Sequence, residues 1–350
     1  MKIRLSNNKV IASNGKCFII AEAGVNHNGS LKIAKKLIDL AVTAGADAVK
    51  FQTFLADEII LKNAPKANYH IETTGSDKKL SWYDLLKTQE MNHKMHKLLI
   101  SYCKKKNIVF MSTPYDKKSV DLLCKLKVKI FKIASTDSNN YQLIEYIAKK
   151  RKPVILSTAM SSLKEVKKSV KILKKYLKKN FVLMQCTGSY PAPIKDTNLK
   201  VIETFRKKFR CLVGYSDHAI GDAAAIASIS FGISCYEKHI TIDKKLPGPD
   251  HRSSLNKNEF IKLVKKIRSA EAAIGDGFKK VMPSEKNNTK KLKKYFVANK
   301  KILKGQKIRS VDISAKRTGG FGISAGDYFS IINKRAWRSF KKNEIIIRNV

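Results

Sequence analysis

Long hydrophobic runs are absent from this chain of 350 residues. No stretch approaches the roughly 18 consecutive apolar residues that a membrane-spanning helix needs. The polar start MKIRLSNNKVIASNGK also lacks the apolar core of a signal peptide. We therefore expect a cytoplasmic protein without a membrane partner.

Cysteine-pair motifs are absent as well. The chain contains no CxxC, and most of its cysteines lie in apolar runs, which is typical of reduced thiols in a protein core. This pattern argues against a disulfide framework and against a zinc ribbon. The six cysteines are Cys17, Cys103, Cys124, Cys186, Cys211 and Cys235.

Acidic residues are scarce: 28 Asp and Glu face 71 Lys and Arg, for a net charge of +43. So basic a chain can bind nucleic acid or another polyanion. However, the lysines are spread along the whole chain, as in SLKEVKKSVKILKKYLKKN (162–180), and no recognised nucleic-acid motif accompanies them. We expect a solvated surface that helps to collect anionic substrates, with no nucleic-acid partner. A non-catalytic, polyanion-binding barrel is the alternative.

Apolar runs alternate with amphipathic stretches from residue 17 to about 243, which is the pattern of βα units around a parallel sheet. Eight such units in this length predict an α/β fold of the TIM (β/α)8 barrel type. The predicted strands are 17–24, 48–54, 108–114, 128–135, 153–160, 181–188, 211–218 and 235–242. Helical spacing is found in 31–45, 95–107, 120–127, 141–150, 223–232 and 257–275.

Polar residues at the strand ends separate a barrel from an open sheet. Each run begins apolar and ends polar, as Glu22, Ser157 and His239 illustrate. In a barrel all these ends meet at one mouth, where the chemistry of such enzymes lies. In an open sheet only the strands at the topological switch point would need polar ends.

Composition changes after the last predicted helix. We expect a barrel domain at 1–276, a polar, Lys-rich linker at 277–294 and a satellite domain at 295–350. The insertion 55–90 is long for a βα loop and lies at the predicted active face, which suggests a lid or substrate-binding loop.

Two of the seven histidines, His218 and His239, end consecutive predicted strands, so they are neighbours at the mouth. One divalent metal could bridge them, with about four positions left for water and substrate, which suits Mn²⁺ better than tetrahedral zinc. An acid beside each, Asp217 and Glu237, favours a metal over two hydrogen-bonded, half-buried histidines. Glu22 could bind a metal-bound water and act as a base, or cap a loop.

Two lysines, Lys50 and Lys132, stand inside apolar strand runs, where an unpaired ammonium is costly. Together with the hydroxyls of Thr113, Ser135 and Ser216, they suit a ligand that carries both a phosphate and a carboxylate.

Two other interpretations of these lysines remain open. One lysine could form a Schiff base, as in class I aldolases. Alternatively, both could make structural ion pairs with Glu22 or Asp137.

Two loops add candidates. In GPDHRSS (248–254), Asp250 could bind a polyol with His251 and Arg252 as accessories, although a simple Pro-Asp turn fits equally well. Arg317 stands beside a glycine turn in AKRTGGFGIS and could close over another site, or be an ordinary surface arginine.

Several motifs in this order resemble the sialic acid synthase family, which comprises N-acetylneuraminate, legionaminate and pseudaminate synthases. The resemblance covers nearly the whole chain. It implies a metal-dependent TIM barrel followed by a small antifreeze-like (SAF) domain, in a domain-swapped homodimer whose small domain covers the partner's barrel. The motifs are FIIAEAGVNHNGSLKIAKKLI, AGADAVKFQTF, STPYD, FKIAST, LSTAM, CTGSYPAP, VGYSDHAIG, EKHITIDKKLPGPDH and KRTGGFGIS.

The resemblance also implies a reaction. Phosphoenolpyruvate condenses with an N-acylated amino hexose and water to give a nine-carbon 2-keto acid and phosphate, by C–O cleavage. Glu22, His218 and His239 match catalytic residues, and the two histidines match metal ligands. Phosphoenolpyruvate contacts match Lys50, Thr113, Lys132, Ser135 and Ser216, and sugar contacts match Gln52, Asp137, Tyr190, Asp250 and Arg317, the last from the neighbouring subunit.

Two departures from the family pattern concern the sugar. Asp137 stands where the family commonly has glutamate, and Gly188 where N-acetylneuraminate synthases tend to have asparagine. N-Acetylmannosamine is the first choice of substrate, and a 2,4-diacetamido hexose, which gives a legionaminate-type product, is the alternative. For the metal, Mn²⁺ is the first choice, with Mg²⁺ or Co²⁺ as alternatives. A metal-dependent aldolase that acts on pyruvate itself would release no phosphate.

Overall fold

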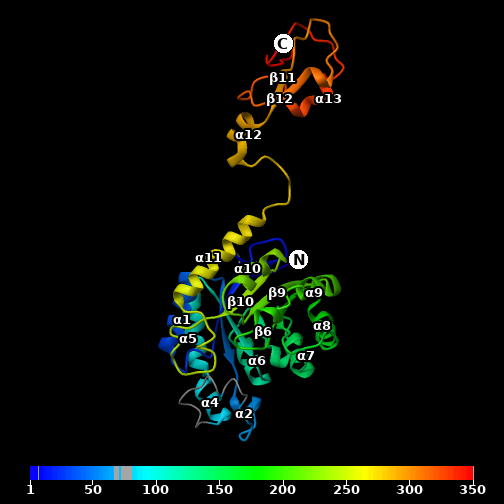
Figure 1. Ribbon diagram of the computed structural model, residues 1–350. Coiled ribbons are helices and arrows are strands. Elements are labelled where there is room, and N and C mark those ends of the chain that lie inside the picture. The colour runs from blue at the N-terminus through cyan, green and yellow to red at the C-terminus, as the bar shows by residue number, and fades with distance from the viewer. Residues whose placement is uncertain (7, 67–70, 72–80, 350) are drawn as a thin grey trace. The chain divides into compact units, whose positions relative to one another are not determined.

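The structure is a computed structural model that describes residues 1–6, 8–66, 71 and 81–349 (Figure 1). The chain divides into two compact units, Met1–Gly275 and Asp276–Val350. Each unit has its own core, so each is described separately.

The first unit is a closed barrel of eight parallel strands, in the order β10-β3-β4-β5-β6-β7-β8-β9. The predicted TIM barrel is therefore confirmed, and all eight predicted strands are present. The strands are β3 Phe18–Gly24, β4 Ala48–Thr53, β5 Val109–Pro114, β6 Phe131–Ile133, β7 Val154–Ser157, β8 Phe181–Cys186, β9 Leu212–Asp217 and β10 Cys235–His239.

Helices follow the strands and surround the barrel, as Figure 1 shows. Several begin at side-chain caps, for example Ser162 with Glu165 in a capping box, which satisfies backbone N–H groups that the first turn leaves unpaired. The helices are α1 Leu31–Ala44, α2 Ala56–Ile59, α4 Trp82–Gln89, α5 His93–Lys105, α6 Lys117–Lys125, α7 Tyr141–Lys149, α8 Leu163–Leu177, α9 Val201–Phe209, α10 Ala223–Ser230 and α11 Lys257–Ile274.

The fourth barrel strand along the chain is shorter than its predicted range. The run 128–135 yields only Phe131–Ile133 as strand, because the chain turns into a 3₁₀ helix, Ser135–Asp137, immediately afterwards. This turn places the side chains of Ser135 and Asp137 at the barrel mouth.

Strand side chains alternate between two cores because successive residues point to opposite faces. One core lies between the strands and the outer helices. The other fills the barrel and includes the hairpin of β1 (Lys2–Ser6) and β2 (Lys9–Ala12). The hairpin packs against residues at the strand starts, such as Phe18 and Ala48, so it closes the amino-terminal end of the barrel. The carboxyl end of the barrel is left free for a cavity.

The second unit contains β11 Tyr295–Ala298 and β12 Ile313–Lys316, an antiparallel pair, with the short helices α12 Lys286–Leu292 and α13 Tyr328–Ile331. Its core is built from residues such as Phe296, Ile313 and Phe340. Part of the segment 277–294, expected to be a linker, is helical as α12. That this unit is an antifreeze-like domain remains a prediction.

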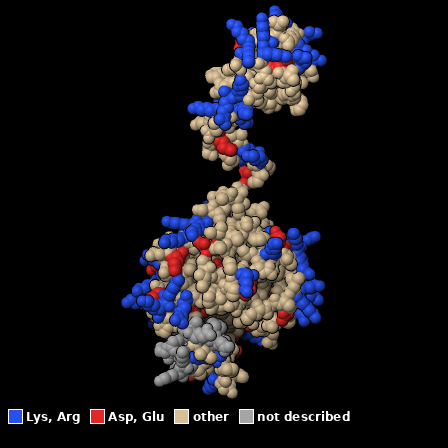
Figure 2. Space-filling view, viewed as in Figure 1, with Lys and Arg blue, Asp and Glu red and all other residues tan. Residues whose placement is uncertain are grey.

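On the face of the barrel unit in view in Figure 2, the basic side chains do not gather in one stripe. Figure 2 shows Lys and Arg at several separate places on the face of the barrel unit in view, interspersed with acids and with uncharged surface. This distribution favours the solvated surface expected from the sequence over a single polyanion groove. Among the described residues, no helix is both long enough and apolar enough to cross a membrane.

Candidate active site

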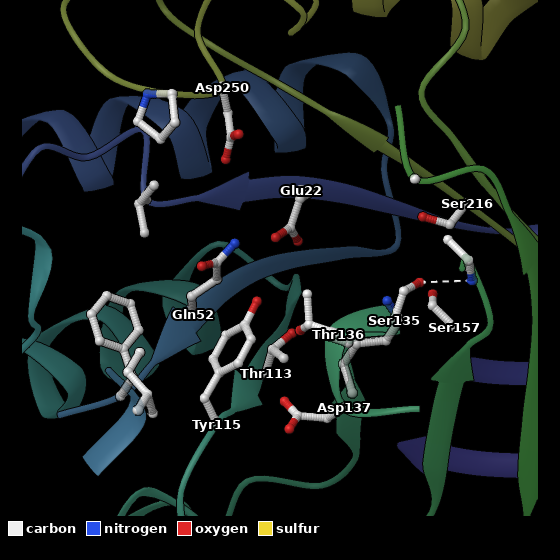
Figure 3. A pocket seen from close by; sticks show the side chains of 18 of the residues that line it. Glu22, Gln52, Thr113, Tyr115, Ser135, Thr136, Asp137, Ser157, Ser216 and Asp250 are labelled. Atoms are coloured by element: carbon white, nitrogen blue, oxygen red, sulfur yellow. Dashed lines mark hydrogen bonds between the residues drawn. The ribbon is translucent and has the colours of Figure 1, made fainter. Parts of the chain in front are cut away.

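A cavity of about 700 Å³ opens at the carboxyl ends of the strands (Figure 3). It is where TIM-barrel enzymes place their chemistry. Of the thirteen residues that the family resemblance matched to the site, the structure brings twelve to its walls: Glu22, Lys50, Gln52, Thr113, Lys132, Ser135, Asp137, Tyr190, Ser216, His218, His239 and Asp250.

The thirteenth candidate, Arg317, belongs to the second unit. There its Nε donates to the Leu292 carbonyl at 3.4 Å. Its role toward the sugar stays a prediction.

Two buried lysines and two buried glutamates form an ion-pair cluster at the floor of the cavity. Lys50 Nζ lies 2.6 Å from Glu22 Oε2 and 3.7 Å from Glu237 Oε2, and Lys132 Nζ lies 3.0 Å from Glu237 Oε1. All four side chains are at most 5% exposed. Charges buried this deeply persist only when paired, so an anionic ligand would have to share these lysines with the glutamates.

The two glutamates differ in their pKa. Burial raises the pKa of Glu22 to about 7, against the pull of Lys50. Burial also acts on Glu237, but Lys132 and Lys50 outweigh it and lower the pKa of that carboxyl to about 2. Glu237 is therefore a permanent counter-charge, whereas Glu22 is the carboxyl that can exchange a proton near neutral pH.

Hydroxyl groups surround the lysines. Lys50 Nζ donates to Thr113 Oγ1 at 3.1 Å, and Ser216 Oγ donates to Glu237 Oε1 at 3.0 Å. The Ala159 N–H donates to Ser135 Oγ at 3.0 Å. Figure 3 shows Ser135, Ser157 and Ser216 together on one side of the cavity, which we call the hydroxyl side.

The histidines His218 and His239 face each other, with ring centroids 5.6 Å apart. His218 Nδ1 lies 2.7 Å from the Thr187 carbonyl, an arrangement that holds a proton on Nδ1 and leaves the lone pair on Nε2. His239 Nδ1 is buried without a hydrogen-bond partner among the described residues, and Asp250 Oδ2 lies 3.9 Å from it. Burial, together with the neighbouring His218 and Lys50, holds the pKa of His239 well below its usual range.

These nitrogens fit a divalent metal. The described part of the chain contains no group of three or more His, Cys, Asp or Glu side chains arranged for a metal ion. A metal here would therefore take two imidazoles from the protein and keep its other positions for water or substrate, as Mn²⁺ can.

The remaining candidates line the cavity around this centre. Tyr190 packs on His218, with ring centroids 4.0 Å apart. The side chains of Glu22, Gln52 and Asp250 converge around Gly24, since a Cβ built there would lie within 3.3–3.6 Å of all three. Burial raises the pKa of Asp250 to about 6.

Asp137 is held by Asn140, whose Nδ2 donates to Asp137 Oδ1 at 2.9 Å. Burial raises the pKa of Asp137.

Gly188 also lines the cavity, but a Cβ there would meet Met160 Cγ at 2.9 Å and Ala159 Cβ at 3.4 Å. Since Ala159 is hydrogen-bonded to Ser135, Gly188 lies next to the hydroxyl side. Met160 occupies the space that a side chain at 188 would take.

The acids beside the histidines in the sequence, Asp217 and Glu237, pair with lysines. Asp217 points to the outer face of the barrel, where its carboxylate lies 3.0 Å from Lys238 Nζ and accepts from Tyr236. Glu237 faces inward, but it pairs with the lysines rather than with His239. The expected pairing of Lys132 with Glu22 or Asp137 is replaced by Glu237, whereas the Lys50–Glu22 pair is present.

Several lining residues were not predicted as site residues, among them Glu237, Ser157 and Tyr115. A signal existed for Glu237, because it stands two residues before His239 on the same strand and so shares its face. Ser157 gave a weaker signal as one of the polar strand ends. Tyr115 lies beyond its strand and stands in the motif STPYD, but no role was predicted for it.

His251 has a structural role in the loop that carries Asp250. It is fully buried, with Nδ1 2.7 Å from Thr241 Oγ1 and Nε2 3.3 Å from Asn28 Oδ1. Burial lowers its pKa to about 4 from an ordinary value of 6.5. Arg252 is exposed and does not line the cavity.

His251 should make the stability of the protein fall in acid. The folded state resists protonation of this ring. The contribution of the neutral His251 ring to the free energy of unfolding is therefore fully present above pH 6.5 and is lost as the pH falls toward 4. At about 1.4 kcal/mol per pKa unit, the loss is about 2–3 kcal/mol. In urea unfolding between pH 7 and 4, His251→Gln should reduce the fall in unfolding free energy by that amount. His93→Gln, at an exposed position, should leave this fall unchanged. If the unfolding free energy fell equally with pH in wild type and in His251→Gln, His251 would not be the cause.

Together the fold and the cavity define a (β/α)8-barrel enzyme whose site offers buried lysines and hydroxyls to an anion beside a pair of histidines. The NeuB family model matches residues 37–279. An N,N'-diacetyllegionaminic acid synthase of Campylobacter jejuni is 43% identical, over 95% of this chain and 99% of that protein. The human N-acetylneuraminate-9-phosphate synthase is 33% identical, over 100% of this chain and 97% of that protein.

A solved structure agrees with these relatives. The N-acetylneuraminic acid (sialic acid) synthetase of Leptospira borgpetersenii has a TM-score of 0.71 and 35% identity, over 83% of this chain and 95% of that one. The chain belongs to the NeuB family. It is a synthase that condenses phosphoenolpyruvate with an amino sugar, and therefore a transferase; enzymes of this family are generally metal-dependent.

Proposed function

We propose that this enzyme condenses phosphoenolpyruvate with a 2,4-diacetamido hexose and water, giving a nine-carbon 2-keto sugar acid and phosphate by C–O cleavage. One observation carries the proposal: the same cavity contains lysines and hydroxyls that can bind an anion and two histidines that can bind a metal. N-Acetylmannosamine, the first choice from the sequence, is the competing substrate.

The choice of sugar rests on the relatives. The one named for N,N'-diacetyllegionaminic acid shares 43% identity, against 33% for the one named for N-acetylneuraminate 9-phosphate. Asp137 supports the same choice, because it is one methylene shorter than the glutamate common in the family and leaves more room at the mouth.

Phosphoenolpyruvate would bind over the buried lysines. Lys50 and Lys132 would pair with its carboxylate and phosphate, with Thr113, Ser135 and Ser216 as hydroxyl donors. Binding would draw Lys50 away from Glu22, 2.6 Å from it in this structure, and so leave that carboxylate free to accept a proton.

His218 and His239 would hold the metal, with Mn²⁺ as first choice and Mg²⁺ or Co²⁺ as alternatives; when bound, it supplies Lewis-acid polarisation of the sugar aldehyde. Gln52, Asp137, Tyr190 and Asp250 would orient the sugar.

The bonds then change as follows. C3 of phosphoenolpyruvate forms a bond to the aldehyde carbon with the electron pair of its C2=C3 double bond, which leaves C2 electron-poor. Water adds to C2 and gives one proton to a Glu22 carboxylate oxygen, from which it passes to the oxygen of the former aldehyde. The C2–O bond to phosphate then breaks, the new C2 hydroxyl becomes the ketone, and its proton leaves with the phosphate.

The second unit completes the proposal. We place Arg317 against the acetamido group of a sugar bound in the partner's barrel, in a domain-swapped homodimer whose antifreeze-like domain covers that barrel. A cytoplasmic location remains part of this proposal.

The test uses the full-length protein, phosphoenolpyruvate and Mn²⁺ with N-acetylmannosamine, its 6-phosphate or 2,4-diacetamido hexoses. We expect phosphate release and the mass of a nine-carbon keto acid, with the highest kcat/KM for a diacetamido sugar. With ¹⁸O in the bridging oxygen of phosphoenolpyruvate, the label should leave in phosphate. Label in the keto acid would refute C–O cleavage, and product from the 6-phosphate alone would replace the proposed substrate.

A further inference from the structure

One side of the cavity is apolar and is made by the insertion after β4. Buried and half-buried side chains from α2, α4 and their flanks line the same cavity as Lys50. We call this set the insertion wall: Ile59, Ile60, Trp82, Leu85 and Leu86. The lid predicted for 55–90 falls partly on 67–70 and 72–80, which lie outside the described residues, and the wall includes none of them.

The insertion wall adjoins the side of the cavity opposite the hydroxyls. In Figure 3, Gln52 and Tyr115 stand on one side of Glu22, and Ser135, Ser157 and Ser216 on the other. Gln52 and Tyr115 come from β4 and the end of β5, the two strands that flank the insertion, and Phe54 packs edge-on against Tyr115. The cavity is thus polar and cationic at one end and apolar with isolated polar groups at the other.

The wall is held in place from outside. Lys87 of α4 pairs with Asp57 of α2 at 2.8 Å, and Tyr83 donates to the same carboxylate at 2.5 Å. The Ala56 N–H donates to Glu90 Oε1 at 2.7 Å. These contacts join the two ends of the insertion on its solvent face, so the apolar side chains on the cavity face have a fixed support.

This arrangement divides the substrates between the two ends. Phosphoenolpyruvate belongs with the lysines and hydroxyls, and the sugar aldehyde must lie beside it at the histidines. The rest of the sugar chain would then extend away from the hydroxyl side, toward the insertion wall. A hexose with only hydroxyls at that end gains little from apolar side chains, whereas an acetamido group presents a methyl to them and an amide to Gln52 or Tyr115.

We infer that the insertion wall binds the second acetamido group of the sugar and is the feature that selects a doubly acylated hexose over N-acetylmannosamine. The inference rests on the proposed function and deepens it. One methyl group in an apolar pocket discriminates substrates by roughly 10-fold or more.

The test compares kcat/KM for a 2,4-diacetamido hexose and for N-acetylmannosamine in wild type, Leu86→Asn and Ile60→Thr. Both changes keep a similar side-chain shape and make the wall polar. We expect the preference for the diacetamido sugar to fall about 10-fold, with KM for phosphoenolpyruvate unchanged. Leu61→Asn is the matched control, because Leu61 is 75% exposed and does not line the cavity; it should leave the preference unaltered.

Unchanged selectivity in both wall variants, or an equal loss for both sugars, would overturn the inference while the synthase function stands. If the wild type prefers N-acetylmannosamine, the inference and the proposed sugar both fail, while the phosphoenolpyruvate-dependent synthase activity stands. If the wild type turns over neither sugar, the proposed function itself fails. Two variants are used so that a folding defect in one does not decide the outcome, and melting temperatures identify such a defect.

Discussion

His239→Ala and His218→Ala are each expected to lower kcat/KM at least 1000-fold in the phosphate-release assay. A metal that polarises the aldehyde contributes several kcal/mol to transition-state stabilisation, and each 1.4 kcal/mol is a factor of ten. The unpartnered Nδ1 of His239 and the Thr187-bound ring of His218 are the observations behind this expectation. Removing the metal from wild type with a chelator should give the same loss, restored by Mn²⁺.

The control for the histidine variants is His93→Ala, since His93 is exposed on α5 and does not line the cavity. It should keep wild-type activity. Both site variants should keep the far-ultraviolet circular dichroism of wild type. The histidines would not be required for catalysis if metal-stripped wild type, or the variant with alanine at both 218 and 239, kept full turnover.

Lys132→Met is expected to raise KM for phosphoenolpyruvate at least 100-fold and to lower the free energy of unfolding by about 3 kcal/mol. The stability loss follows because Lys50, 3.7 Å away, would be the only cation left to pair with the buried Glu237 among the described residues, and breaking a buried pair costs about 3–5 kcal/mol. The rise in KM follows because the carboxylate and phosphate of phosphoenolpyruvate would lose one of their two lysine partners. Urea unfolding and steady-state kinetics measure the two effects.

A double variant separates stability from binding. In Lys132→Met/Glu237→Gln the uncompensated carboxylate is gone, so most of the stability should return while the high KM persists. Lys238→Met is the matched control: it breaks another buried pair, with Asp217 on the outer face of the barrel, and should lose stability without a change in KM. A normal KM in Lys132→Met would show that phosphoenolpyruvate does not use this lysine.

The positions of the strands could be predicted because their physical cause is local. A strand buried on both faces must be apolar throughout, so eight apolar runs separated by amphipathic stretches indicate a closed parallel barrel. The polar residues that end these runs, such as Glu22 and His239, could be recognised as lining one mouth for the same reason. The short β6 was overestimated, because its apolar run continues into a turn that only the Ser135–Asp137 backbone reveals.

The partners of the polar groups could not be predicted in the same way. Glu237 and Asp217 each stand close to a histidine in the sequence, yet one faces the cavity and the other the outer helices. Alternation along a strand decides this, and a difference of one residue in where the strand ends reverses it. Lys132 meets Glu237, 105 residues away, because β6 and β10 face each other across the barrel interior rather than as hydrogen-bonded neighbours.

By itself the sequence determined the barrel, the mouth and the residue types that gather there, because burial and strand alternation are written into the order of apolar and polar side chains. Only the tertiary structure decided the charge balance of the site and its division into a hydroxyl side and an apolar insertion wall. Those properties arise from contacts between residues that are far apart in the sequence. Their side chains come together only when the sheet closes into a barrel and the loops pack at its mouth.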